Sequence, residues 1–168
     1  ITPGSLFVGR FEFDMMAENQ LTLTKFGIAY DKKPLYFKGA YKYEAGENFV
    51  DGSDKENVKE NTGETDQCGI YAVLYEATDK DGQEVVLDGT NITNSEYRVA
   101  LAEIKSGVDT EGKWVEFNEE FTYLEGKSYD SSKQYKMAIV CSSSKEGDSF
   151  RGAVNSTLFV DELEIVGE

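Results

Sequence analysis

The sequence predicts an all-β fold, an antiparallel sandwich formed by a single domain. Nine short segments are rich in Tyr, Phe, Val, Ile and Thr, the residue types that favour strands. Turn-forming stretches such as TDKDGQ, VDTEGK and SKEGDS separate them at the close spacing typical of sandwiches. The length of 168 residues suits one domain, because a chain of this size buries about 70% of its unfolded surface without metals or disulfides.

Two of the expected strands are apolar on both faces. Along CGIYAVLYEA, Ile70 and Leu74 point to one side while Tyr71 and Tyr75 point to the other, because successive side chains of a strand alternate. The stretch YKMAIVC follows the same pattern, so both strands are expected at the centre of a covered or concave sheet. In chain order, the expected strands are residues 5–16, 21–30, 35–46, 68–78, 83–90, 96–105, 113–124, 134–144 and 156–167.

One segment has a helical alternative. In NSEYRVALAEIKSG, Ser95 is suited to cap a short helix and Gly107 to end it. Tyr97, Val99 and Leu101 also alternate, which favours a strand, and we predict the strand.

The segment from Asp51 to Asp66 is predicted to be a solvated connecting loop. It contains six acidic residues, two lysines and a single apolar residue, Val58. Such a composition buries too little apolar surface to join a core.

The charge balance and the absence of histidine exclude several classes of function. The chain has 32 acidic and 17 basic residues, a net charge of −15, which opposes binding to nucleic acid or to anionic membrane surfaces. No apolar run approaches the ~20 residues of a membrane helix. Histidine is absent, so serine or cysteine triads and catalytic zinc sites have little support.

Two cysteines, Cys68 and Cys141, lie in separate expected strands. They are either two buried thiols or one disulfide bridge. Thiols are favoured, because a domain of this size does not need a covalent link to fold.

The stretch EFDMMAE is the strongest catalytic candidate, since paired carboxylates hydrolyse glycosides. On a strand, Glu12 and Glu18 would lie about 20 Å apart. Glycosidase carboxyl groups must approach to ~5–5.5 Å or ~6.5–9.5 Å, depending on the stereochemistry. A glycoside hydrolase is therefore the least favoured alternative.

A possible metal site involves the first and last strands. Asp161 shares a face with Phe159 and Leu163, which otherwise read as core, so its carboxylate needs a partner. A bulge or a backbone N–H bond at a sheet edge would supply one. If the terminal strands pair, however, Glu12 and Asp161 would converge and offer oxygen ligands of the kind that Ca²⁺ prefers.

Aromatic side chains are the candidates for ligand binding. Rings on a concave sheet stack on the apolar faces of sugars, while neighbouring polar groups such as Arg98 bond to hydroxyls. Each ring taken singly is more simply explained as core packing. The aromatic set is Tyr41, Tyr43, Tyr71, Tyr75 and Trp114.

Four stretches resemble the putative carbohydrate metabolism domain family. They are residues 21–49, 66–77, 112–123 and 137–166, and they include the YKY at Tyr41 to Tyr43, the run SSSKEGDSFRGA and the closing STLFVDELEI. The resemblance spans roughly residues 20 to 168. It implies a jelly-roll sandwich similar to carbohydrate-binding modules, in an exported protein of the bacterial cell surface or periplasm, where it is commonly the C-terminal module of a larger chain. It carries over no catalytic residue.

More distantly, GRFEF and LFVDELEI look like the first and last strands of calcium-containing binding modules, which implies Glu12 and Asp161 as metal ligands. GRFEF lacks the Asn and the second Gly usual there. We therefore predict a non-catalytic module that binds a poly- or oligosaccharide through Tyr43, Tyr71, Tyr75 and Arg98, with a structural Ca²⁺ held by Glu12 and Asp161. The first alternative is an adhesive module that docks onto a protein partner.

Overall fold

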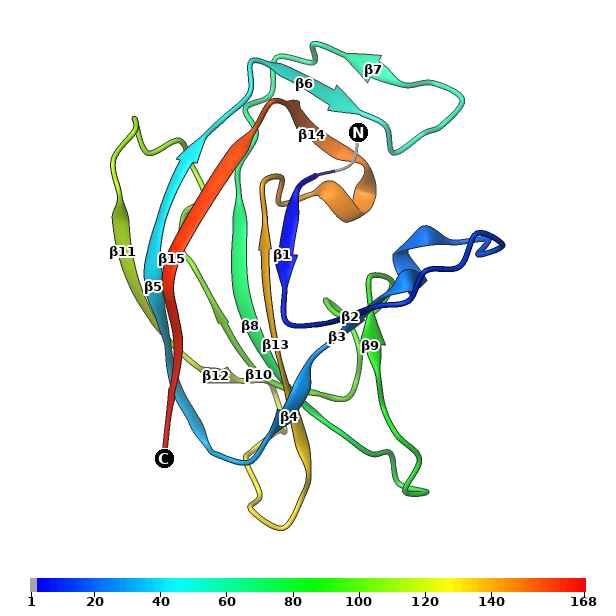
Figure 1. Cartoon of the computed structure of the whole chain (residues 1–168), viewed down its shortest axis with the longest axis vertical. Coiled ribbons are helices and arrows are strands. Elements are labelled where there is room, and N and C mark those ends of the chain that lie inside the picture. Colours follow the sequence, from blue (N-terminus) through cyan, green and yellow to red (C-terminus); the bar gives the residue numbers. More distant parts are fainter. Residues whose placement is uncertain (1–2) are drawn as a thin grey trace.

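The computed structural model describes residues 3–168 as an almost purely β structure (Figure 1). All strand pairs are antiparallel, which confirms the predicted class, an all-β sandwich. The described residues form two short 3₁₀ turns, η1 (Gln20–Leu23) and η2 (Gly147–Ser149), and no α-helix.

The larger sheet has six strands and contains the two central strands that the sequence predicts. Its order is β1 (Ser5–Phe7), β13 (Tyr135–Ser142), β8 (Gly69–Glu76), β10 (Arg98–Glu103) and β12 (Thr122–Tyr123). β4 (Ile28–Tyr30) pairs with the far end of β13. The helical alternative around Ser95 is thus wrong, because β10 pairs with β8 at Arg98 and again from Ala100 to Glu103.

The second sheet of the sandwich is built around β5 (Pro34–Glu44), which lies between β11 (Val115–Glu120) and β15 (Thr157–Gly167). Two small sheets flank the sandwich. One consists of β14 (Arg151–Val154), β6 (Asn48–Asp51) and β7 (Lys59–Glu60), and the other of β2 (Gly9–Phe11), β3 (Thr24–Phe26) and β9 (Leu87–Asp88).

The six-stranded sheet is covered by apolar side chains on both faces. Phe37, Ile70 and Leu74 belong to the main core between the two large sheets. Val73 and Leu87 belong to a second cluster on the opposite face, beneath β3 and β9. Side chains of β8 and β13 therefore alternate between two separate cores, which explains why both strands carry apolar residues on both faces.

The first and last strands do not pair, so the condition for a shared Glu12 and Asp161 site is not met. β1 pairs with β13 in the larger sheet, whereas β15 pairs with β5 in the other one. Asp161 lies at a bulge on this edge strand, where the register shifts between Asp161 and Glu164. Its carboxylate accepts the backbone N–H of Glu162 at 2.8 Å, and Glu162 has a φ of 53°. Leu158 and Val160 pack against the main core before the bulge, and Leu163 and Ile165 do so after it, whereas Asp161 and Phe159 are exposed on the outer face. The expectation that Asp161 interrupts a core face is therefore wrong, because the bulge shifts the alternation of the strand.

The first expected strand ends earlier than its sequence suggests. Asp14 accepts the backbone N–H of Met16 on its carboxylate at 2.8 Å and that of Ala17 on its carbonyl, and the chain turns there. An Asx turn of this kind competes with a sheet ladder for the same N–H groups. Residues 12–19 consequently project from the body as the dark blue loop in Figure 1.

Both cysteines are buried free thiols, as favoured from the sequence. Burial raises the pKa of Cys68 and of Cys141 to about 12, so both stay protonated at neutral pH. Within residues 3–168, no helix has the length and apolar character needed to cross a membrane.

Candidate functional site

A groove of about 820 Å³ lies on the face of the six-stranded sheet that points away from the second sheet. Its floor crosses four neighbouring strands, because Phe7 of β1 is opposite Val140 of β13, Val140 is opposite Tyr71 of β8, and Tyr71 is opposite Glu103 of β10. Val73 continues the floor along β8. A ligand in the groove would therefore lie on a rigid, hydrogen-bonded surface.

Connecting segments form the walls. The N-terminal segment contributes Phe11 and Phe13 together with residues of η1 and β3. The segment after β13, which contains η2, contributes Lys145 and Asp148, and the turn after β9 contributes Ile92. The lining is mostly apolar with a few charged groups, the composition typical of small-molecule sites.

Tyr71 faces the groove because it alternates with Ile70 and Ala72, which enter the main core. Its ring is half-buried. Burial raises the pKa of the Tyr71 phenol, and the nearby carboxylates of Asp148 and Glu103 raise it further. The hydroxyl is therefore a proton donor across the whole neutral range.

Arg98 begins β10 and lines the same groove. The register of the β8–β10 pair shifts between Arg98 and Ala100, so the regular pairing of the two strands is interrupted next to Arg98. Its Nε atom is buried and has no hydrogen-bond partner, and Arg98 forms no ion pair within residues 3–168. An unpaired buried donor costs about 1–3 kcal/mol, so this arrangement needs an explanation.

The charges that line the groove are balanced. Lys145 Nζ lies 2.9 Å from Glu103 Oε1, and Asp148 accepts the hydroxyl of Ser149 at 3.3 Å. With Arg98, the charged lining residues comprise two cations and two anions. The groove thus differs from the chain as a whole, which carries a net charge of −15.

Only two of the four tyrosine and arginine residues predicted to bind a ligand lie in the groove, namely Tyr71 and Arg98. Tyr43 is 0% exposed in the main core, and its hydroxyl donates to the Ser143 carbonyl at 3.0 Å. Tyr75 is also 0% exposed, and its hydroxyl donates to the Phe26 carbonyl at 2.6 Å. Their rings pack in the interior and have no exposed surface for a ligand, so neither lines the groove.

The structure does not bring together the two predicted metal ligands. Glu12 follows β2 and forms an exposed ion pair with Arg10 at 2.8 Å, whereas Asp161 lies on β15 in a different sheet. Across the described residues, no three or more carboxylate or cysteine side chains gather in the way a metal ion requires. Calcium binding by either residue stays a prediction without a shared site.

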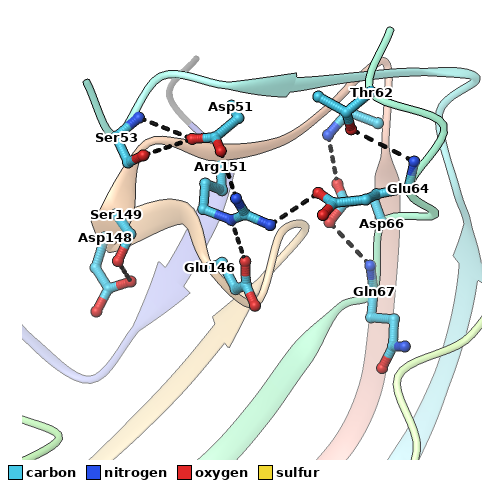
Figure 2. A network of polar contacts seen from close by, with 11 residues as sticks. Asp51, Ser53, Thr62, Glu64, Asp66, Gln67, Glu146, Asp148, Ser149 and Arg151 are labelled. Carbon is cyan, nitrogen blue, oxygen red and sulfur yellow. Dashed lines mark hydrogen bonds and ion pairs between the residues drawn. The ribbon is translucent and has the colours of Figure 1, made fainter. Parts of the chain in front are cut away.

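The groove wall at η2 is held by a charge network (Figure 2). The Arg151 guanidinium lies between three carboxylates: Nη1 is 2.6 Å from Asp51, Nη2 is 2.8 Å from Glu64 and Nε is 2.5 Å from Glu146. Asp51 and Glu64 belong to the acidic segment, and Glu146 immediately precedes η2. The acidic segment therefore anchors the wall, and none of its residues lines the groove.

A buried carboxylate completes this anchor. Asp66 is 3% exposed, and its Oδ2 atom accepts the Ser144 hydroxyl at 2.7 Å, the Ser156 hydroxyl at 2.7 Å and the Ala153 N–H at 2.8 Å. A Cβ added to Gly152 would lie 2.5 Å from Ser144 Oγ. Only glycine lets β14 approach Ser144 this closely.

Most residues of the groove lining are not predicted by the sequence pattern. Glu103 lies on the same face of β10 as Leu101, but Val99, which has the same parity, lies in the main core. The register shift between Arg98 and Ala100 breaks the alternation, so parity counted along the segment does not assign Glu103 to the groove. Phe11 and Phe13 were assigned to an ordinary strand. Lys145 and Asp148 lie in a turn, for which periodicity gives no signal.

Comparisons with known proteins identify the family. The sequence profile of the putative carbohydrate metabolism domain matches residues 1–166. No curated protein sequence matches the chain. Among solved structures, a putative glycoside hydrolase from Bacteroides thetaiotaomicron VPI-5482 is 39% identical with a TM-score of 0.86, and the match covers 99% of this chain and 47% of that one.

A second solved structure, a putative glycoside hydrolase from Bacteroides vulgatus ATCC 8482, is 36% identical with a TM-score of 0.80, over 99% of this chain and 65% of that one. The chain spans less than two thirds of the length of either protein. It belongs to the putative carbohydrate metabolism domain family.

Proposed function

We propose that this domain is a non-catalytic module that binds a glycan in the groove above β8 and β10. The main support is that one groove combines aromatic side chains with polar groups that point into it. The chain also belongs to a carbohydrate-related family. The volume of about 820 Å³ lies within the range of about 300–1,000 Å³ usual for ligand sites.

Each part of the groove has a role in this proposal. The half-buried ring of Tyr71 and the exposed rings of Phe11 and Phe13 offer apolar surfaces on which sugar rings stack. Arg98 and the protonated Tyr71 hydroxyl donate hydrogen bonds to sugar oxygens. The carboxylate of Glu103 accepts from sugar hydroxyls.

The context of the module is also proposed. The two similar structures are longer than this chain, which is consistent with a module of a larger protein. We place that protein outside the cytoplasm, at the cell surface or in the periplasm, where glycans are met. This placement rests on the family resemblance.

The test is retention of the purified domain on a broad polysaccharide and glycan array. Tyr71→Ala is expected to weaken binding about tenfold, because a ring contact worth about 1.4 kcal/mol is lost. Trp114→Ala is the matched control, since Trp114 is a half-exposed aromatic residue that immediately precedes β11 of the other large sheet and does not line the groove. Full retention by a folded Tyr71→Ala variant would reject the groove as the site.

A glycoside hydrolase is the second candidate, because both similar structures are named putative glycoside hydrolases and the groove contains Glu103 and Asp148. Hydrolysis needs two carboxyl groups on opposite sides of the scissile bond. Turnover of chromogenic glycosides that is lost in Glu103→Gln and Asp148→Asn would support it. Retention of glycan without turnover supports the binding module.

Docking onto a protein partner has one observation in its favour. Met15 and Met16, at the tip of the projecting loop, are 85% and 86% exposed and do not line the groove. Exposed apolar patches often mark protein interfaces. This function would be favoured if the domain bound no glycan on the array and captured a defined protein partner. The double variant Met15→Ser/Met16→Ser should then abolish that capture.

A further inference from the structure

The three arginines of this chain differ sharply in their partners. Arg10 pairs with Glu12, and Arg151 pairs with Asp51, Glu64 and Glu146. Arg98 pairs with no acidic residue in the part of the chain that the structure describes, although the protein has 32 acidic residues. The arginine in the groove is thus the exception.

The environment of Arg98 makes this exception informative. Its Nε atom is buried without a hydrogen-bond partner, while the residue lines the groove. An atom closed to water is closed to a ligand oxygen of similar radius as well, so a ligand in the groove would meet the Nη donors of the guanidinium, which have no ion-pair partner within residues 3–168. An acceptor supplied by a ligand would complete the site.

The geometry of a guanidinium narrows the chemistry of that ligand. Arginine presents its donors as a planar fork that matches two oxygens of one carboxylate, and such charge-assisted pairs are stronger than bonds to neutral hydroxyls. A neutral sugar would leave the positive charge of Arg98 without a counter-charge. We propose that Arg98 binds the carboxylate of an acidic sugar, a uronic or sialic acid unit, an inference that rests on the proposed glycan-binding function.

The charges around Arg98 permit an anionic ligand despite the acidity of the whole chain. The Glu103 carboxylate is neutralised by Lys145 at 2.9 Å. Of the other charged lining residues, Asp148 is the one anion and Arg98 the one cation, so their charges cancel. Salt screens more distant charges beyond about 8–10 Å. The potential that a ligand meets in the groove therefore depends on this balanced set more than on the net charge of −15.

The experiment compares matched pairs of probes in which carboxylates are free or masked as methyl esters. The probes are 3′-sialyllactose with its methyl ester, and trigalacturonic acid with its trimethyl ester, titrated calorimetrically into the domain at physiological salt. We expect the acidic member of at least one pair to bind about tenfold or more tightly than its neutral partner. Arg98→Met is expected to abolish this difference and to leave weak binding of the neutral member.

Two further variants keep the test decisive. Arg98→Lys retains the charge without the fork and is expected to retain only part of the preference. Arg10→Met changes the net charge by the same amount outside the groove and should leave the preference intact. Melting curves establish that each variant is folded.

The possible failures are distinguishable. Equal binding of acidic and neutral probes, or a preference that survives Arg98→Met, would overturn the role of Arg98 and leave the glycan-binding function standing. If no probe in either pair binds and the glycan array is silent as well, the proposed function fails and the acid preference fails with it.

Discussion

The acidic segment, residues 51–66, and the apolar segment, residues 11–16, both lie at the surface, but they are held in opposite ways. The acidic segment pairs with distant parts of the chain through Arg151 and Asp66 (Figure 2). The apolar segment is fastened at its base by the bond from the Glu12 N–H to the Leu23 carbonyl, and beyond that by the local turn at Asp14.

The composition of each segment suggests the reverse. A segment with six acids is expected to be a loose connector, yet Asp66 is 3% exposed and accepts hydrogen bonds from Ser144, Ala153 and Ser156. A segment with two Phe and two Met residues is expected in a core, yet Phe13 is 78% exposed. Whether a surface segment is held to the body of the domain thus depends on the hydrogen bonds and ion pairs available to it rather than on its hydropathy.

The largest effect is expected for Asp66→Ala. This change leaves two hydroxyls and a backbone N–H without their acceptor, so the free energy of unfolding should fall on the order of 3 kcal/mol. Urea denaturation measures it. Asp54→Ala, in the same segment but at an exposed local turn, is the control and should have little effect. Equal stability of the two variants would show that Asp66 anchors nothing.

A smaller effect is expected for Arg151→Met, which leaves Asp51, Glu64 and Glu146 close together without their shared cation. The urea midpoint should fall less than for Asp66→Ala, and amide hydrogen exchange across the acidic segment should become several-fold faster. Lys59→Met removes a positive charge from the acidic segment itself and serves as control. Unchanged exchange in Arg151→Met would contradict the anchoring role of Arg151.

The acidic segment also predicts a dependence on pH. Hydrogen bonds from the Ser53 hydroxyl and N–H lower the pKa of Asp51, and the nearby Arg151 lowers it further. Because its folded-state pKa is below the unfolded value of about 3.9, Asp51 stabilises the fold above that pH, and this contribution is lost as the pH falls further. Urea midpoints from pH 7 to pH 3 should drop more steeply below pH 4 in the wild type than in Asp51→Asn. Parallel curves would argue against this contribution.

The smallest effect is expected in the apolar segment. Met15→Ser/Met16→Ser should change the free energy of unfolding by less than about 0.5 kcal/mol, because neither side chain packs against the body. Met137→Ser is the matched control at a buried position and should cost about 2–5 kcal/mol. A loss in the double variant comparable to that of Met137→Ser would mean that the loop folds back onto the domain in solution.

Several features of the fold were predictable from local pattern. Alternation placed β8, β10 and β13 correctly and put Tyr71 on the face opposite Ile70, because the side-chain period of a strand is a property of the backbone alone. Turn-forming residues such as Gly, Asp and Ser marked most of the strand boundaries. The strand expected at 83–90 was reduced to Leu87–Asp88, since its pairing depends on β3, which is distant in sequence.

The candidate site was only half predictable. Tyr71 and Tyr75 share one face of β8, yet Tyr71 borders the groove while Tyr75 is covered by Phe26 and Leu87 of neighbouring strands. Parity states which side of a strand a residue occupies and says nothing of what covers that side. The same limit placed Tyr43 among ligand-binding residues when it is buried in the main core.

The sequence by itself determined the all-β class, the central strands, the family and the exclusion of histidine chemistry, because composition, alternation and local turns are encoded over short stretches. Tertiary structure alone decided that Glu12 and Asp161 lie apart, next to β2 and on β15 of different sheets, and that the groove forms above β8 and β10. It also decided that Arg98 has no acidic partner among residues 3–168. These features depend on which strands pair across long separations, and that choice minimises the free energy of the whole chain rather than of any one segment.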